Sequence, residues 1–195
     1  QATGATSDMA SEASGADDEA ALLELLIDQL RDLLHAERQL LKALPKLQKA
    51  ARTEQLASVF SRHLAETETQ VERLTHALER LGASTRAKPC KGMQGLLEEG
   101  DEILSKSTKK DDTSADLALI AAAQKVEHYE IAGYTTARNL AQQLHLPQVV
   151  HLLQLTLGEE QNADQLLAQL ARPLMSSARM PAPLTTQSST GASRS

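Results

Sequence analysis

The chain has 195 residues, of which 41% are hydrophobic and only 2% aromatic. This length suffices for one domain with a substantial core, and an apolar content dominated by leucine and alanine favours packed helices over a β-sandwich or barrel. A net charge of −6 and the scarcity of aromatic side chains argue against nucleic acid as a partner. No apolar run approaches the roughly 18 residues of a membrane span, so we expect no membrane partner.

Both ends of the chain are rich in small and polar residues. Residues 1–18 and 175–195 have little apolar surface to bury, so we predict flexible tails on either side of one domain at residues 19–174. The single cysteine, Cys90, excludes an internal disulfide and fits a reducing compartment. We expect Cys90 to have a packing role.

Four long helices are predicted, at about residues 19–51, 54–81, 114–144 and 147–171. Apolar residues in these segments recur at spacings of three and four, which is typical of helices packed in a bundle. Pro45 should kink or end the first part of the first helix, and Gly82 should end the second helix. Ser114 is expected to cap the third helix, and Pro173 follows the fourth.

The connections between these helices predict the topology. The first and second helices, and the third and fourth, are joined by short turns and should form antiparallel hairpins. The long connection at residues 82–113 contains a short amphipathic helical pattern at about residues 93–104, followed by a polar loop. Two hairpins joined by one long crossover are the arrangement of a ferritin-like four-helix bundle, so the expected fold class is all-α.

Acidic residues interrupt each apolar stripe near the middle of its helix. In the first helix, Glu37 occupies a position between Leu33 and Leu40 where the pattern calls for a leucine. The other three stripes carry acidic or amide side chains at matching depth, namely Glu66 and Gln70, then Glu127 and Glu130, then Glu160 and Asp164. Because mid-helix positions of antiparallel neighbours meet at one level, these side chains should converge.

Converging buried carboxylates need compensation. An ionised carboxylate in the interior costs several kcal/mol unless it is paired, and neighbouring like charges add to that cost. His63 is the nearest basic residue on the stripes, so a bound cation is the simplest compensation. Oxygen ligands suit Fe, Mn or Mg, and bridging carboxylates suit a pair of ions. We predict a site for two ions, Fe or Mn, with the metal ligands Glu37, Glu66, Gln70, Glu127, Glu130, Glu160 and Asp164.

Two of these positions have competing interpretations. The second helix has an alternative apolar stripe, formed by Leu56, Phe60, Leu64, Val71, Leu74 and Leu78, which would move Glu66 toward the edge. In the fourth helix, Ala163 competes with Asp164 for the inward position. A single glutamate on a helix stripe is usually a boundary residue that reaches solvent. The prediction therefore depends on all four helices showing the same interruption.

Several motifs resemble the YciF-type ferritin-like family of bacterial stress proteins. The most specific is AAAQKVEHYEIA at residues 121–132, and the others are AERQL at 36–40, HLAET at 63–67, KPCKGMQGL at 88–96 and TLGEE at 156–160. The similarity covers about residues 22–174, with order and spacing kept. The Glu-x-x-His pairs of the wider ferritin-like pattern are missing, because Thr69 and Ala163 stand three residues after Glu66 and Glu160.

The resemblance implies a ferritin-like bundle, a homodimer, a cytoplasmic location, a link to stress responses and a di-metal site related to that of rubrerythrins. Two functions fit it. One is a di-iron or di-manganese oxidoreductase that acts on peroxide or dioxygen. The other is a non-catalytic structural or assembly-forming protein with a vestigial or absent metal site. The chain carries no cysteine-rich electron donor, so a redox cycle would need an external reductant.

The first helix also carries more leucine than one packing stripe requires. These additional leucines are Leu22, Leu23, Leu25, Leu34 and Leu41. Apolar patches of this kind usually mark partner surfaces. They independently predict a homodimer or a larger homo-oligomer.

Overall fold

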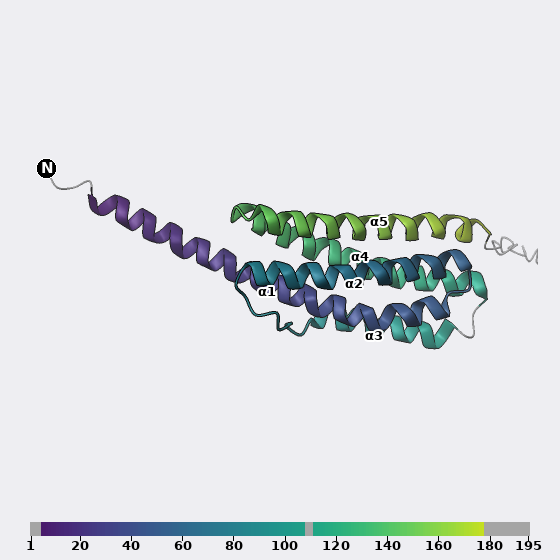
Figure 1. Ribbon diagram of the computed structural model, residues 1–195. Coiled ribbons are helices and arrows are strands. Elements are labelled where there is room, and N and C mark those ends of the chain that lie inside the picture. The colour runs from purple at the N-terminus through teal and green to yellow at the C-terminus, as the bar shows by residue number, and fades with distance from the viewer. Residues whose placement is uncertain (1–4, 108–110, 178–195) are drawn as a thin grey trace, which may run out of the picture.

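The computed structural model describes residues 5–107 and 111–177, and these residues form five helices and no strand (Figure 1). The helices are α1 (Ala5–Ala50), α2 (Glu54–Arg80), α3 (Lys91–Ser107), α4 (Asp112–Gln143) and α5 (Pro147–Ser177). α1 packs on α2, and α4 packs on α5, while the short α3 packs on α4 and α1. The all-α prediction is confirmed. No helix within the described ranges is long and apolar enough to cross a membrane.

α1 begins at Ala5, well before the predicted start at about residue 19. Its N-terminal part extends away from the other helices (Figure 1), and residues 17–21 are exposed. A helix already held by packing of its later residues extends through alanine-containing sequence at small cost, because no new nucleus is needed. Residues 178–195, which make up most of the predicted C-terminal tail, lie outside the described residues.

Single residues determine where two of the helices begin or end. α4 is capped by Asp111 rather than by Ser114, since the Asp111 carboxylate accepts a hydrogen bond from the Ser114 backbone N–H at 2.9 Å. α2 ends at Arg80, with Leu81 as its C-cap, and Gly82 follows directly as the predicted terminating glycine. Gly82 has a φ of 64°, in the left-handed region that favours glycine.

Neither proline inside a helical segment ends its helix. α1 continues through Pro45 to Ala50, and α5 continues through Pro173 to Ser177, beyond the predicted end at about residue 171. In both helices a leucine after the proline, Leu47 or Leu174, packs against the core. We attribute the continuation to this burial, which offsets the backbone hydrogen bond that proline cannot make.

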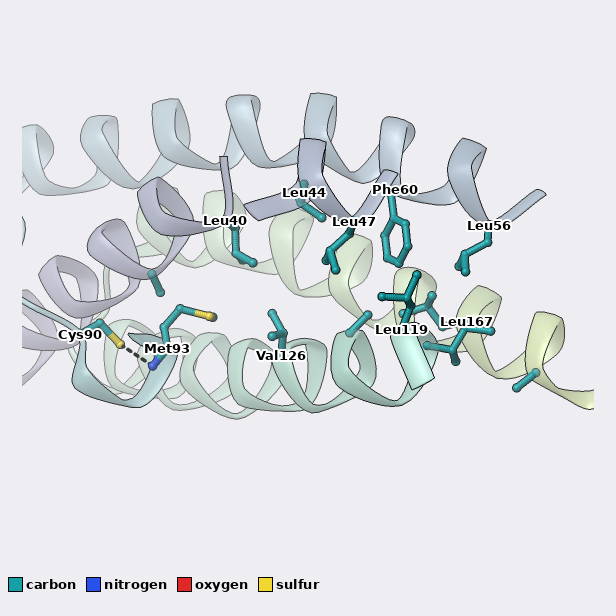
Figure 2. Close-up of a cluster of buried hydrophobic side chains, with 14 residues drawn as sticks. Leu40, Leu44, Leu47, Leu56, Phe60, Cys90, Met93, Leu119, Val126 and Leu167 are labelled. Carbon is teal, nitrogen blue, oxygen red and sulfur yellow. Dashed lines mark hydrogen bonds between the residues drawn. The ribbon is translucent and has the colours of Figure 1, made fainter. Parts of the chain in front are cut away.

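Two apolar clusters fill the interior. The first apolar cluster includes Leu40, Leu44, Leu47, Leu56, Phe60, Leu119, Val126 and Leu167 (Figure 2). The second apolar cluster includes Leu26, Leu30, Leu33, Leu34, Leu74, Tyr134, Val149 and Leu153. Each long helix contributes to both clusters. α1 and α5 reach the second cluster before the first, and α2 and α4 do the reverse, so the four polar interruptions lie at one level between the clusters.

Cys90 lies directly before α3 and is buried with a free thiol. Its Sγ is 2.9 Å from the Tyr129 hydroxyl and accepts a hydrogen bond from the Met93 backbone N–H, the contact dashed in Figure 2. The Tyr129 hydroxyl donates to Asp32 at 2.9 Å. These contacts join α1, α3 and α4. Burial raises the pKa of the Cys90 thiol, which disfavours the reactive thiolate and supports a packing role.

Candidate metal centre

Five of the seven predicted ligands lie in the interior between the apolar clusters. Glu37, Gln70, Glu130 and Glu160 are completely buried, and Glu127 is 3% exposed. Glu66 and Asp164 lie farther out, each with a side chain that is 22% exposed. Each of the four long helices thus places at least one of its predicted mid-helix polar residues in the interior, and two of the seven residues lie at the edge.

The tightest group contains a residue outside the predicted set. Ligand atoms of His63, Glu127, Glu130 and Glu160 all lie within 4.8 Å of one another, and all four residues are buried. His63 Nε2 lies 3.5 Å from both a Glu127 oxygen and a Glu160 oxygen. We call these four residues the inner cluster. It takes one residue from α2, two from α4 and one from α5.

The buried face of α2 combines the two predicted stripes. Its buried residues are Leu56, Phe60, His63, Thr67, Gln70, Leu74, Ala77 and Leu78. The helix therefore turns His63 and Gln70 inward, as one stripe predicted, and moves Glu66 toward the edge, as the other predicted. In α5, Ala163 takes the inward position and Asp164 the outer one. Asp164 there accepts a hydrogen bond from the Gln124 amide at 2.8 Å.

Glu37 and Gln70 lie beside the inner cluster and have partners of their own. The Tyr134 hydroxyl donates a short hydrogen bond to Glu37 Oε1. Gln70 donates its amide N–H to Glu159 at 3.0 Å, and Arg73 holds Glu159 with two N–H groups at 2.6 and 2.8 Å. The Gln70 carbonyl oxygen remains buried without a hydrogen-bond partner. This carbonyl oxygen is the atom of the Gln70 amide that can bind a metal ion, and no hydrogen bond occupies it.

Burial shifts the acid–base equilibria of the whole group. Burial, followed by the charge of Glu160, raises the pKa of Glu37 to about 8. Burial likewise raises the pKa of Glu127 to about 8 and those of Glu130 and Glu160 well above 4.5. Burial lowers the pKa of His63, but contact with Glu66 and the charges of Glu160 and Glu37 outweigh it and raise that pKa above 6.5. Without a cation, Glu37 and Glu127 therefore favour the protonated form near neutral pH.

The residues present fit a divalent cation. Buried polar atoms usually have hydrogen-bond partners, yet both nitrogens of His63 and both oxygens of Glu130 and Glu160 have none. The spread of 4.8 Å among the ligand atoms is comparable to twice a metal–oxygen distance of about 2.0–2.6 Å. Carboxylates and an imidazole form a donor set that suits Fe or Mn better than a thiolate-preferring ion.

The sequence contained a signal for His63. The order Glu-x-x-His of the wider ferritin-like pattern is absent, whereas α2 carries the reverse order, His63-x-x-Glu66. Both orders place a histidine and a carboxylate on one helix face. His63 Nδ1 lies 3.5 Å from Glu66 Oε2. The reversed pair was therefore a usable signal for the inner cluster.

Fold and site together define the class of this protein: it is all-helical within the described residues and contains a buried His/Glu cluster. The family described as a domain of unknown function, DUF892, matches residues 21–179, and the chain belongs to this family. It is 44% identical over 149 residues to protein YciF of Escherichia coli strain K12, covering 76% of this chain and 89% of that relative. The resemblance to YciF-type proteins seen in the motifs is thereby confirmed.

Solved structures agree with this assignment. The crystal structure of the E. coli stress protein YciF matches with a TM-score of 0.76 and 39% identity, covering 80% of this chain and 98% of that chain. YcfI of Rhodopseudomonas palustris matches with a TM-score of 0.71 and 38% identity, covering 75% and 92%. A two-domain Anabaena variabilis protein containing DJ-1/ThiJ/PfpI-like and ferritin-like domains shares the fold, with a TM-score of 0.54 and 18% identity, over 83% of this chain and 40% of its own.

Proposed function

We propose that this protein is a ferritin-like stress-response protein whose four long helices form a bundle around a di-metal centre of Fe or Mn. The observation that carries the proposal is the inner cluster, four buried ligands converging from three helices with most of their polar atoms unpartnered. The link to stress responses rests on 44% identity to YciF, since E. coli YciF is described as a stress protein.

His63, Glu127, Glu130 and Glu160 would hold the ions directly, and Glu37 would complete the set. Glu37 is fixed by the Tyr134 hydroxyl, which leaves its second oxygen buried and unpartnered. The Arg73–Glu159 pair fixes the Gln70 amide and leaves the Gln70 carbonyl oxygen as a neutral donor. These supporting contacts pre-orient ligand side chains before any cation arrives.

When bound, Fe or Mn would supply Lewis-acid and redox chemistry toward peroxide or dioxygen. The chain's own residues contribute a site that the two apolar clusters close off on both sides. They also contribute carboxyls that exchange a proton for a cation near neutral pH, because burial raises the pKa of Glu37 and that of Glu127 to about 8.

Metal content tests the proposal. We expect the purified protein to contain Fe or Mn at about two ions per chain by elemental analysis. Glu130→Gln should abolish most of this content, because the amide keeps the shape of Glu130 and removes its charge. Glu68→Gln, at an exposed position of α2, is the matched control and should retain it. Absence of metal from both the unmodified protein and its Mn- and Fe-reconstituted forms would refute the proposal and favour a structural protein without a metal site.

We also propose that the protein forms a homodimer or a larger homo-oligomer. Leu25 on α1 is 47% exposed, whereas Leu34, another of the additional leucines, is buried inside the chain. Sedimentation velocity at micromolar concentration should show an assembly larger than 21.0 kDa. Leu25→Glu should weaken that assembly, whereas a monomeric unmodified protein would contradict it.

A further inference from the structure

A small cavity connects the surface of the molecule with one residue of the inner cluster. It lies between α1, α3 and α4, has a volume of about 30 Å³, and has Asp101 and Glu127 among its lining residues. The Asp101 side chain is 60% exposed, whereas the Glu127 side chain is 4% exposed. The cavity therefore has an exposed end on α3 and a buried end on α4.

The wall of the cavity between these two carboxylates is hydrocarbon. Its other lining residues are leucine, alanine, valine and glycine, among them Leu40 on α1 and Val126 on α4 (Figure 2). At the exposed end, Asp101 is paired with Lys46 at 3.3 Å. At the buried end, Glu127 Oε2 has no hydrogen-bond partner. An unused carboxylate oxygen thus lies at the inner end of an apolar cavity.

The volume and the wall of the cavity select a very small apolar occupant. One water needs roughly 10–15 Å³, and an apolar cavity of about 150 Å³ holds benzene, so about 30 Å³ suits a molecule the size of a diatomic gas. Water needs roughly two to four polar partners, which a hydrocarbon wall does not supply. Hydrogen peroxide would lose its hydration there for the same reason. Dioxygen has no such hydration to lose.

We propose that this cavity binds dioxygen next to Glu127, at the approach to the proposed metal centre. The inference rests on the proposed function, and it selects dioxygen over peroxide as the small molecule that reaches the centre from this side. An apolar cavity concentrates an apolar gas, because transfer of apolar surface out of water is favourable. The same wall keeps hydrated ions and other polar molecules away from Glu127.

Small residues leave room for the cavity on each of the three helices. They include Ala43 on α1, Gly100 on α3 and Ala122 on α4. Gly100 lies inside α3, where glycine lowers helix stability relative to alanine. A Cβ added at Gly100 would meet nothing within 4 Å, so close packing does not require a glycine there. Retention of the open cavity accounts for this glycine.

Dioxygen itself is the probe in the first test, because its paramagnetism speeds the relaxation of nearby methyl groups. In the metal-free full-length protein under dioxygen pressure, we expect the Leu40 methyls to relax several-fold faster than those of Leu30. Both leucines are buried, but Leu30 belongs to the second apolar cluster and does not line the cavity. Gly100→Leu and Ala122→Val should remove the difference, because their larger side chains fill the cavity. Gly95→Leu, at an exposed position of α3 outside the cavity, is the matched control and should retain it.

A second test measures access to the centre with nitric oxide, an apolar diatomic ligand of Fe²⁺ whose binding is followed by absorbance. In the Fe²⁺-loaded protein without dioxygen, Gly100→Leu and Ala122→Val should slow the association of nitric oxide several-fold. Gly95→Leu should leave the association rate nearly unchanged. Circular dichroism of each variant excludes unfolding as the cause. If one filled variant does not fold, the other variant and the comparison of methyl groups within the unmodified protein still decide.

The failure of this inference differs from the failure of the proposed function. Equal relaxation of the Leu40 and Leu30 methyls in the unmodified protein would overturn the dioxygen site and leave the metal centre intact. Nitric oxide association that is unchanged in both filled variants would also overturn it. If the protein takes dioxygen into the cavity but binds no Fe²⁺, the proposed metal centre fails, and the role of the cavity as an approach to it fails as well.

Discussion

At the scale of single residues, the unusual feature is a set of carboxyls that remain in a leucine-lined interior. Burial makes ionisation costly, so in the metal-free chain Glu37 and Glu127 behave as weak acids with a pKa of about 8. Their unpartnered oxygens show that protonation lowers the electrostatic cost but leaves hydrogen-bonding capacity unused.

Metal-free protein should lose stability as pH rises. Glu37 and Glu127 bind protons more tightly in the folded chain, with a pKa of about 8, than at the ordinary value of 4.5. Between these values the unfolded chain has released protons that the folded chain keeps, so the free energy of unfolding falls from about pH 4.5 to about pH 8. The raised pKa of His63 acts in the same direction. Urea denaturation in the presence of a chelator, at pH 5 and pH 8, measures this.

A matched variant identifies the source of the pH dependence. Glu127→Gln should flatten the decline, because the amide has no proton to retain. Stability that is constant or rises between pH 5 and pH 8 would show that these carboxyls are hydrated and ionised in the folded chain.

The sequence predicted the inward carboxylates because each interrupts a leucine pattern, as Glu37 does between Leu33 and Leu40. It could not decide between two stripes of α2, since one carries His63, Glu66 and Gln70 and the other, through Leu56 and Phe60, moves Glu66 toward the edge. The choice depends on how α2 is rotated against α5 and α1, which is a tertiary property. Asp164 and Ala163 were ambiguous for the same reason, and packing selected the smaller apolar side chain.

At the scale of helices, the sequence predicted where each helix lies in the chain more accurately than it predicted the residues at which each helix begins and ends. Helix interiors follow from apolar spacing, which many residues determine together. Ends depend on one or two contacts, such as the Asp111 cap of α4. They also depend on contacts from other helices. Asp116 on α4 is completely buried and accepts hydrogen bonds from the backbone N–H groups of Arg52 and Thr53, at 2.7 and 2.9 Å. It thereby fixes the start of α2.

Asp116→Ala should therefore destabilise the protein by about 2–3 kcal/mol, since donors at the α1–α2 turn lose a charged acceptor. The Thr53 hydroxyl, which also donates to Asp116 at 2.7 Å, loses its partner too. Asp112→Ala is the matched control, because Asp112 is 81% exposed and pairs only loosely with Arg52 at 3.6 Å. It should cost no more than about 1 kcal/mol. Equal effects of the two changes in chemical denaturation would contradict a capping role for Asp116.

The packing of α3 against α4 depends on Gly92, which lies against Tyr129. A Cβ added at Gly92 would lie 2.7 Å from Tyr129 Cε2, and the Tyr129 hydroxyl is held by Asp32 and Cys90. Gly92→Ala should therefore destabilise the protein by about 1–3 kcal/mol through overpacking. Gly95→Ala in the same helix meets nothing within 4 Å and should stabilise it by up to about 1 kcal/mol. Thermal unfolding of the pair measures both, and a stabilising Gly92→Ala would show that α3 is free to shift.

At the scale of the whole molecule, the inner cluster lies where all four long helices meet, between two apolar clusters that each draw on all four. A change there acts on global stability rather than on one helix. Cation binding to the native state adds RT ln(1 + [L]/Kd), which is about 2.7 kcal/mol at a hundredfold excess over Kd. The stability of the molecule should therefore depend strongly on whether a cation is present.

Glu127→Gln should change stability in opposite directions with and without metal. In the metal-free protein near pH 8, the variant should be more stable by about 1–3 kcal/mol, because a neutral amide replaces a carboxyl that burial forces to hold a proton. With saturating Mn²⁺ it should be less stable than the unmodified protein, because a ligand is lost.

Each kcal/mol corresponds to roughly 2–4 °C in Tm for a chain of this size. Solvated boundary glutamates would give changes within about 0.5 kcal/mol in both conditions, as Glu68→Gln should. A Glu127→Gln variant whose Tm is unchanged with and without Mn²⁺ would therefore show that the carboxylates do not form one site.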